Sequence, residues 1–148
     1  MGSLLGVKSR NLSRQYKDVL SDFKNWNQRS HARQWILYPE NLGDYLSIDE
    51  TSLSHDELYT IITNKAAKGR KGSIVAIVAG TRAEKVIEIL QKIPEKLRKQ
   101  VKEITLDMAG NMELIARRCF PSAVCVTDRF HVQKLAAEAL QEIRIKHR

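Results

Sequence analysis

The sequence lacks the features that attach a protein to a membrane. No apolar run approaches the roughly 20 residues that a bilayer span requires, and "SIVAIVAG" is only a strand in length. The start, "MGSLLGVKSRN", has no secretory signal, and Gly6 stands where a myristoylation pattern needs Ser or Thr. We therefore expect a cytoplasmic protein with no membrane partner.

Cysteine is also scarce. Cys119 and Cys125 are the only two in the chain, which is too few for a disulfide framework. These two residues and His131 follow one another at six-residue steps, but that spacing matches no common zinc finger. Free thiols packed in a core are predicted instead.

Positive charge, in contrast, is in excess. Lys and Arg number 25 against 17 Asp and Glu, so the net charge is +8 and the pI is about 9.7. A polyanion such as nucleic acid is the default partner of such a chain, because Lys and Arg neutralise phosphates. Charge alone is weak evidence, since it also governs solubility and non-specific association.

The composition changes near residue 44. Residues 1–43 are polar, show helical spacing and contain no run typical of a strand, so they predict a short helical N-terminal segment. Its apolar positions lie at Leu12, Tyr16, Val19, Leu20 and Phe23. Residues 44–148 predict a separate α/β unit.

This α/β unit has regular punctuation. Strands are expected at 45–51, 57–66 and 72–80, then a helix at 81–93 capped by Thr81, and a strand at 102–108. A short helix at 112–120 capped by Asn111, a strand at 122–128 and a helix at 131–148 complete the order. The resulting β-β-β-α-β-α-β-α order is that of the ribonuclease H-like fold, a mixed sheet covered by helices. In that fold the first strand is central, the fourth lies parallel beside it and the fifth lies beyond.

Two aspartates follow buried strand patterns that this topology makes neighbours. Asp49 in "LSIDET" and Asp107 in "ITLDMAGN" come to the carboxyl ends of adjacent strands, where open α/β sheets usually bind ligands. Two close carboxylates repel, and a divalent cation resolves the conflict. Mg²⁺, with Mn²⁺ as a substitute, prefers one or two carboxylates with waters and substrate phosphate. Each aspartate alone is equally well explained as a turn or cap residue, so the pair carries the prediction.

Three further residues are candidate accessory groups. Glu50 lies on the opposite face of its strand from Asp49 and is expected at the surface or behind the metal ligands. Asp128 in "VCVTDRFH" could reach the metal site, orient a ligand or cap the last helix. His131 could contact a phosphate, hold Asp128 or contribute to the cap.

Several of these segments together resemble a known enzyme family. "SIDET", "ITLDMAGNM", "CFPSAVCVTDRFHVQKLAAEAL" and "IRIKHR" are similar to the catalytic region of DDE-type insertion-sequence transposases of the ISL-like group, and closest to its ISAon-type branch. The resemblance covers residues 44–148 nearly continuously, in order and spacing.

The resemblance implies metal-dependent DNA transposition, with cleavage at transposon ends and joining to target DNA. It matches Asp49 and Asp107 to the first two metal-binding acids, and Asp128 and His131 to a D-x-x-H element. Arg82 in "AGTR" matches an arginine that could contact the DNA backbone. A homo-oligomer is expected of the full-length enzyme.

The third acid of that family is a glutamate beyond a helical insertion. Arg148 falls inside the helix that leads into this insertion, so we expect an incomplete catalytic domain with two of three acids. Glu138 and Glu142 on the last helix are expected on its solvated face.

The first residues raise a related expectation. "LLGVKSRNLSRQYKDVL" resembles the second half of a helix-turn-helix, whose partner helix could belong to a separately encoded N-terminal DNA-binding protein. An amphipathic linker helix is an equal alternative. The candidate DNA-binding cations are therefore Arg14 and Lys17 here, Lys68, Arg70 and Lys71 in the turn "KGRKG", and Arg82.

Two other functions fit the same residues. A truncated product could bind element DNA or transposase subunits without catalysis. A structure-specific nuclease of ribonuclease H-like fold would cleave DNA without joining it.

Overall fold

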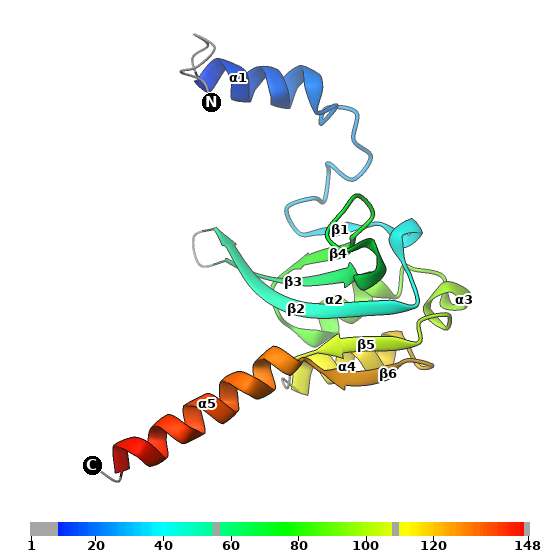
Figure 1. The fold of residues 1–148 in the computed structure, drawn as a ribbon. Helices are drawn as coiled ribbons and strands as arrows, with labels where there is room; N and C mark the ends of the chain where they lie inside the picture. Colours follow the sequence, from blue (N-terminus) through cyan, green and yellow to red (C-terminus); the bar gives the residue numbers. More distant parts are fainter. Residues whose placement is uncertain (1–8, 55–56, 108–109, 147–148) are drawn as a thin grey trace. The chain divides into compact units, whose positions relative to one another are not determined.

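The computed structural model describes residues 9–54, 57–107 and 110–146, which fall into two compact units (Figure 1). The division lies between Gln34 and Trp35. It precedes the change of composition near residue 44, because residues 35–43 make their contacts with the sheet of the second unit.

The first unit begins with a helical stretch and continues in turns from Ser21 to Gln34. Helix α1 (Ser9–Gln15) continues into a π-helical turn, η1 (Tyr16–Leu20). The apolar side chains here remain largely in solvent, from 38% exposed at Leu12 to 73% at Val19. A helix this short gains most of its stability from packing, and η1 buries none of its residues. The preceding turn of the expected helix-turn-helix lies mainly outside the described residues.

The expectation of no strand before residue 44 was wrong. Trp35–Leu37 forms strand β1, which pairs antiparallel with β4 (Ile74–Ala79). Three residues are too few to show a strand pattern, and the pairing partner lies about forty positions away in the sequence. Leu37 is buried in the core, and η2 (Pro39–Asn41) then turns the chain.

A six-stranded mixed sheet forms the centre of the second unit. Its order is β1-β4-β3-β2-β5-β6. Strands β2, β3 and β4 form an antiparallel meander, while β5 and β6 run parallel to β2. This confirms the ribonuclease H-like α/β fold. The remaining strands are β2 (Tyr45–Ser54), β3 (Glu57–Asn64), β5 (Glu103–Leu106) and β6 (Val124–Thr127).

Helices α2 (Ala83–Leu90) and α4 (Gly110–Cys119) contact each other and cover the same face of the sheet (Figure 1). Their buried side chains pack with alternate residues of the strands, including Leu46 and Ile48 of β2 and Ile104 and Leu106 of β5. The short helix α3 (Glu95–Arg98) precedes β5, and α5 (Arg129–Lys146) follows β6. Among the described residues, no helix is both long and apolar enough to cross a membrane.

Both predicted helix caps were wrong. Arg82, not Thr81, occupies the N-cap of α2, and its side chain makes no capping hydrogen bond. Asn111 lies inside α4, which is already helical at Gly110. At Arg82 the backbone is still extended, and side-chain preference alone does not fix where it turns into α2.

Two predicted elements extend beyond the described residues. The expected strand at 102–108 ends at Leu106, and Met108 lies outside the described part. The expected last helix begins two residues early, at Arg129, and is described to Lys146.

Candidate carboxylate site at the ends of two parallel strands

The register between β2 and β5 places Asp49 and Asp107 side by side. Ile48 pairs with Leu106 as the last residue pair of the parallel ladder. The next position on each chain is an aspartate. Parallel strands lie about 4.8 Å apart, so the two backbones bring these carboxylates to neighbouring positions.

The alternation of side chains along each strand separates these aspartates from the core. Ile48 and Leu106 are 1% and 6% exposed, respectively, and pack under the helices. Asp49 is exposed and Asp107 is half-buried, because successive residues of a strand point to opposite faces. The backbone amide of Glu50 donates a hydrogen bond to Oδ1 of Asp49 at 2.8 Å, which orients that carboxylate.

His131 joins Asp107 to the start of the last helix. Its Nε2 lies 3.6 Å from Oδ2 of Asp107, and its Nδ1 lies 3.1 Å from Oδ2 of Asp128. The contact with Asp107 was missed in the sequence, because it depends on where α5 starts relative to the end of a different strand. The D-x-x-H spacing signalled only the local contact with Asp128.

Asp128 serves the helix and the histidine at once. The backbone amide of Phe130 donates to Oδ1 of Asp128 at 3.2 Å, as expected for a residue at the N-cap of α5. The second oxygen faces His131. The capping alternative is therefore present in the structure together with the histidine contact.

Glu50 is electrostatically part of this group of acids. Desolvation raises the pKa of Glu50, and the negative charges of Asp107 and Asp49 raise it further. The charges of both aspartates therefore act on Glu50 at this end of the sheet. Strand alternation alone had set Glu50 apart from Asp49.

Arg82 lies at the same end of the sheet. Thr60 pairs with Glu50 on one side and with Val78 on the other, so the end of β4 lies level with this part of β2. The buried hydroxyl of Thr60 donates to the carbonyl of Gly80 at 2.9 Å. Gly80 has a φ of 95°, which favours glycine. This turn leads into Arg82.

Arg82 lines an open pocket on the surface. Lys85 also lines it, together with Leu58 and residues 79–81, and the Lys85 ammonium donates to the carbonyl of Ala79 at 2.8 Å. Two cationic side chains therefore stand near the first turn of α2, whose amides favour anions.

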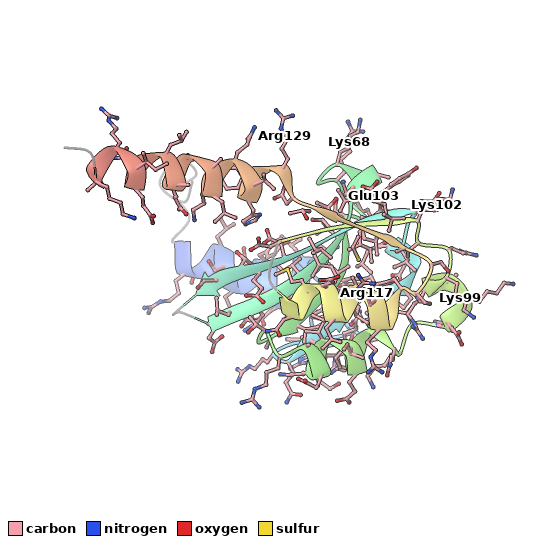
Figure 2. All side chains as sticks on the ribbon, turned by 90° about the horizontal axis from the view of Figure 1, so that it is seen from below. Lys68, Lys99, Lys102, Glu103, Arg117 and Arg129 are labelled. Atoms are coloured by element: carbon pink, nitrogen blue, oxygen red, sulfur yellow. The ribbon has the colours of Figure 1, made fainter. Side chains whose placement is uncertain are left out.

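The cations of the turn "KGRKG" lie toward the other end of the strands. Lys68, Arg70 and Lys71 are exposed between β3 and β4. The end of β3, Asn64, pairs with Leu46 near the start of β2. These cations are thus not grouped with Asp49. Figure 2 shows Lys68 and Arg129, at the start of α5, on the side of the sheet opposite α4 and its labelled Arg117.

Arg14 and Lys17 belong to the first unit and are exposed there. The Lys17 ammonium lies 5.6 Å from the centre of the Phe23 ring. Both side chains are accessible to a polyanion, although they belong to a separate compact unit from the carboxylates.

The donor chemistry at Asp49 and Asp107 fits a hard divalent cation. Carboxylate oxygens from two strands are the ligands that Mg²⁺ prefers, with waters and phosphate completing its shell. Within residues 9–54, 57–107 and 110–146, no three His, Cys, Asp or Glu side chains form a ready-made metal cluster.

The thiols have no part in this site. Cys119 and Cys125 are free, as the sequence predicts. Cys119 is buried, and burial raises the pKa of its thiol to about 11.

Comparison with protein-family models matches residues 46–148 to the transposase family DDE_Tnp_ISL3. This range begins in β2 and includes the carboxylate site, Arg82 and α5. No curated protein matches the chain.

Proposed function

This chain belongs to the ISL3-type DDE transposase family, and we propose that it acts in DNA transposition through metal-dependent strand cleavage and joining at Asp49 and Asp107. The family accounts for transposition and for DNA as the substrate. The observation that carries the catalytic proposal is the β2–β5 register, which brings the two aspartates level on parallel strands.

In this proposal Asp49 and Asp107 hold Mg²⁺, for which Mn²⁺ can substitute. A divalent ion held there would activate a water or 3′-hydroxyl and stabilise the leaving oxygen of an in-line displacement. Asp49 and Asp107 would hold this ion near the scissile phosphate. The amide of Glu50 fixes the carboxylate of Asp49, so its oxygens need little reorganisation when the ion binds.

We infer that the DNA backbone lies across the end of the sheet near Arg82. Phosphate contacts fix the register of a protein on DNA, and they are made mainly by Arg and Lys. Support comes from Arg82 and Lys85, which line a pocket level with Glu50 along the strands. Lys68, Arg70 and Lys71 would contact a more distant stretch of backbone, and Arg14 and Lys17 would bind DNA from the first unit.

Salt-dependent DNA binding tests this contact. Arg82→Ala should lower affinity for a duplex oligonucleotide and reduce the slope of log K against log salt by about 1 per lost phosphate contact. Lys99→Ala is the control, because Lys99, at the C-cap of α3, is paired with Glu95 at 2.7 Å. Equal slopes for wild type and Arg82→Ala would exclude Arg82 from the contact.

The catalytic proposal is tested with supercoiled plasmid in Mg²⁺ or Mn²⁺. Because this chain is expected to carry two of the three acids, we expect nicked and joined products from a transposase that joins it to the third acid, and neither product when Asp49→Asn or Asp107→Asn is introduced. Asp44→Asn is the control, because Asp44 pairs with Lys102 at 2.7 Å near the start of β2.

The alternatives predict other products. Cleavage without joining would favour the structure-specific nuclease, and DNA binding without cleavage would favour a non-catalytic product. Activity that persists in both Asn variants would contradict the assignment of the two aspartates.

A further inference from the structure

The imidazole of His131 lies between two carboxylates that come from different parts of the fold. Its Nδ1 is 3.1 Å from Asp128 at the N-cap of α5, and its Nε2 is 3.6 Å from Asp107 after β5. All three side chains are about one-third exposed, at 29% for His131, 33% for Asp107 and 38% for Asp128. An ion from solvent can therefore reach them.

The contact with Asp128 suits the imidazole tautomer that carries its proton on Nδ1. An ionised carboxylate only accepts hydrogen bonds, so in this tautomer Nδ1 donates to Asp128 and the lone pair of Nε2 faces Oδ2 of Asp107. A cation placed between Nε2 and Oδ2 would be bound by both atoms.

The separation is close to that of two ligands on one cation. Adjacent ligands of an octahedral Mg²⁺ or Mn²⁺ ion, about 2.0–2.2 Å from the metal and at roughly 90° to each other, stand about 2.8–3.1 Å apart. The Nε2–Oδ2 distance is 3.6 Å, so binding would draw these two atoms together by about half an ångström. A carboxylate behind a metal-binding histidine is also a recurrent arrangement, because it fixes the tautomer and the ring orientation.

We propose that His131 supplies a nitrogen ligand to the same divalent cation as Asp107, with Asp128 as the residue that orients it. This inference rests on the proposed function, because it requires that Asp107 binds a metal ion. It adds a nitrogen ligand to a site that otherwise offers carboxylate oxygens. Because Mg²⁺ prefers oxygen ligands and imidazole suits transition metals, this nitrogen favours Mn²⁺ over Mg²⁺.

The competing role for His131 is structural. As an imidazolium it would pair with both carboxylates and fasten the start of α5 to the end of β5 without touching a metal. The two roles differ in whether a histidine nitrogen is bonded to the ion.

Pulsed electron paramagnetic resonance of Mn²⁺ bound to the full chain separates them. We expect a ¹⁴N coupling from a directly bound imidazole, which is lost in His131→Gln and kept in the control His31→Gln. Circular dichroism of each variant verifies folding. Bound Mn²⁺ without a ¹⁴N coupling would overturn this inference and leave the aspartate site intact. No bound Mn²⁺ at all would overturn both the inference and the proposed metal site.

Metal affinities give a second, independent readout. His131→Gln should weaken Mn²⁺ binding at least about tenfold and Mg²⁺ binding much less. Asp128→Asn should weaken Mn²⁺ binding roughly 10-fold or more, as for other residues that orient a ligand, and Asn preserves the N-cap of α5. An equal loss of affinity for both ions in His131→Gln would contradict a nitrogen ligand.

Discussion

Ile48 and Leu106 form the last pair of the β2–β5 ladder, and Asp49 and Asp107 follow them one residue later. The first pair is buried under α2 and α4, whereas the second is accessible to ions. On each strand, the buried residue thus contributes to stability, and the aspartate that follows it is placed for chemistry. The two roles should be separable by substitution, because the core would hold the strands in register whether or not the carboxylates are occupied.

The largest effect is expected at the buried pair. Ile48→Ala should lower the free energy of unfolding by about 2–5 kcal/mol, because it removes buried methyl groups and leaves a cavity. Urea denaturation measures this, with Ser47→Ala on the other face as the control. A loss below about 1 kcal/mol would mean that Ile48 is not in the packed core.

The two cysteines allow the buried core to be compared with the edge of the sheet. Cys119 is buried with its pKa raised to about 11, whereas Cys125 is half-buried on β6. Only thiolates alkylate readily, so iodoacetamide at pH 8 should modify Cys119 roughly 100-fold or more slowly than an exposed thiol. Mass spectrometry locates the label, and urea should remove the protection. Rapid native labelling of Cys119 would contradict its burial.

A smaller effect is expected at Glu50. Its folded-state pKa is raised above 4.5, so the folded state binds more protons than the unfolded state just above that pH. The free energy of unfolding therefore falls as pH rises through this window. Glu50→Gln should be more stable than wild type at pH 7, by less than about 1 kcal/mol because solvent screens the charges.

The pH series gives the control for this prediction. The difference between Glu50→Gln and wild type should shrink below pH 4.5, where the carboxyl is protonated in both states. A Gln variant that is less stable at pH 7 would show that the charge of Glu50 is favourable in the folded protein.

Much of this arrangement could be predicted from local pattern. The apolar runs that end at Asp49 and Asp107 identify two strands, and the element order makes them neighbours. Strand β1 could not be predicted, because three residues carry no period and β4 supplies the pairing. The contact of His131 with Asp107 was equally hidden, since it depends on how α5 leaves β6. In the sequence, Arg82 and Lys68 are both cations beside a predicted strand. Only the strand register shows that they lie toward opposite ends of the strands.

Titration of the full chain with Mg²⁺ and Mn²⁺, followed by calorimetry and NMR, tests most directly whether Asp49 and Asp107 share one ion. Wild type and the control Asp44→Asn should bind. Asp49→Asn and Asp107→Asn should each lose binding while remaining folded, with spectral changes in the wild type confined to the ends of β2 and β5. Binding that survives in either variant, or a folded wild type that binds neither ion at millimolar concentration, would contradict the shared site.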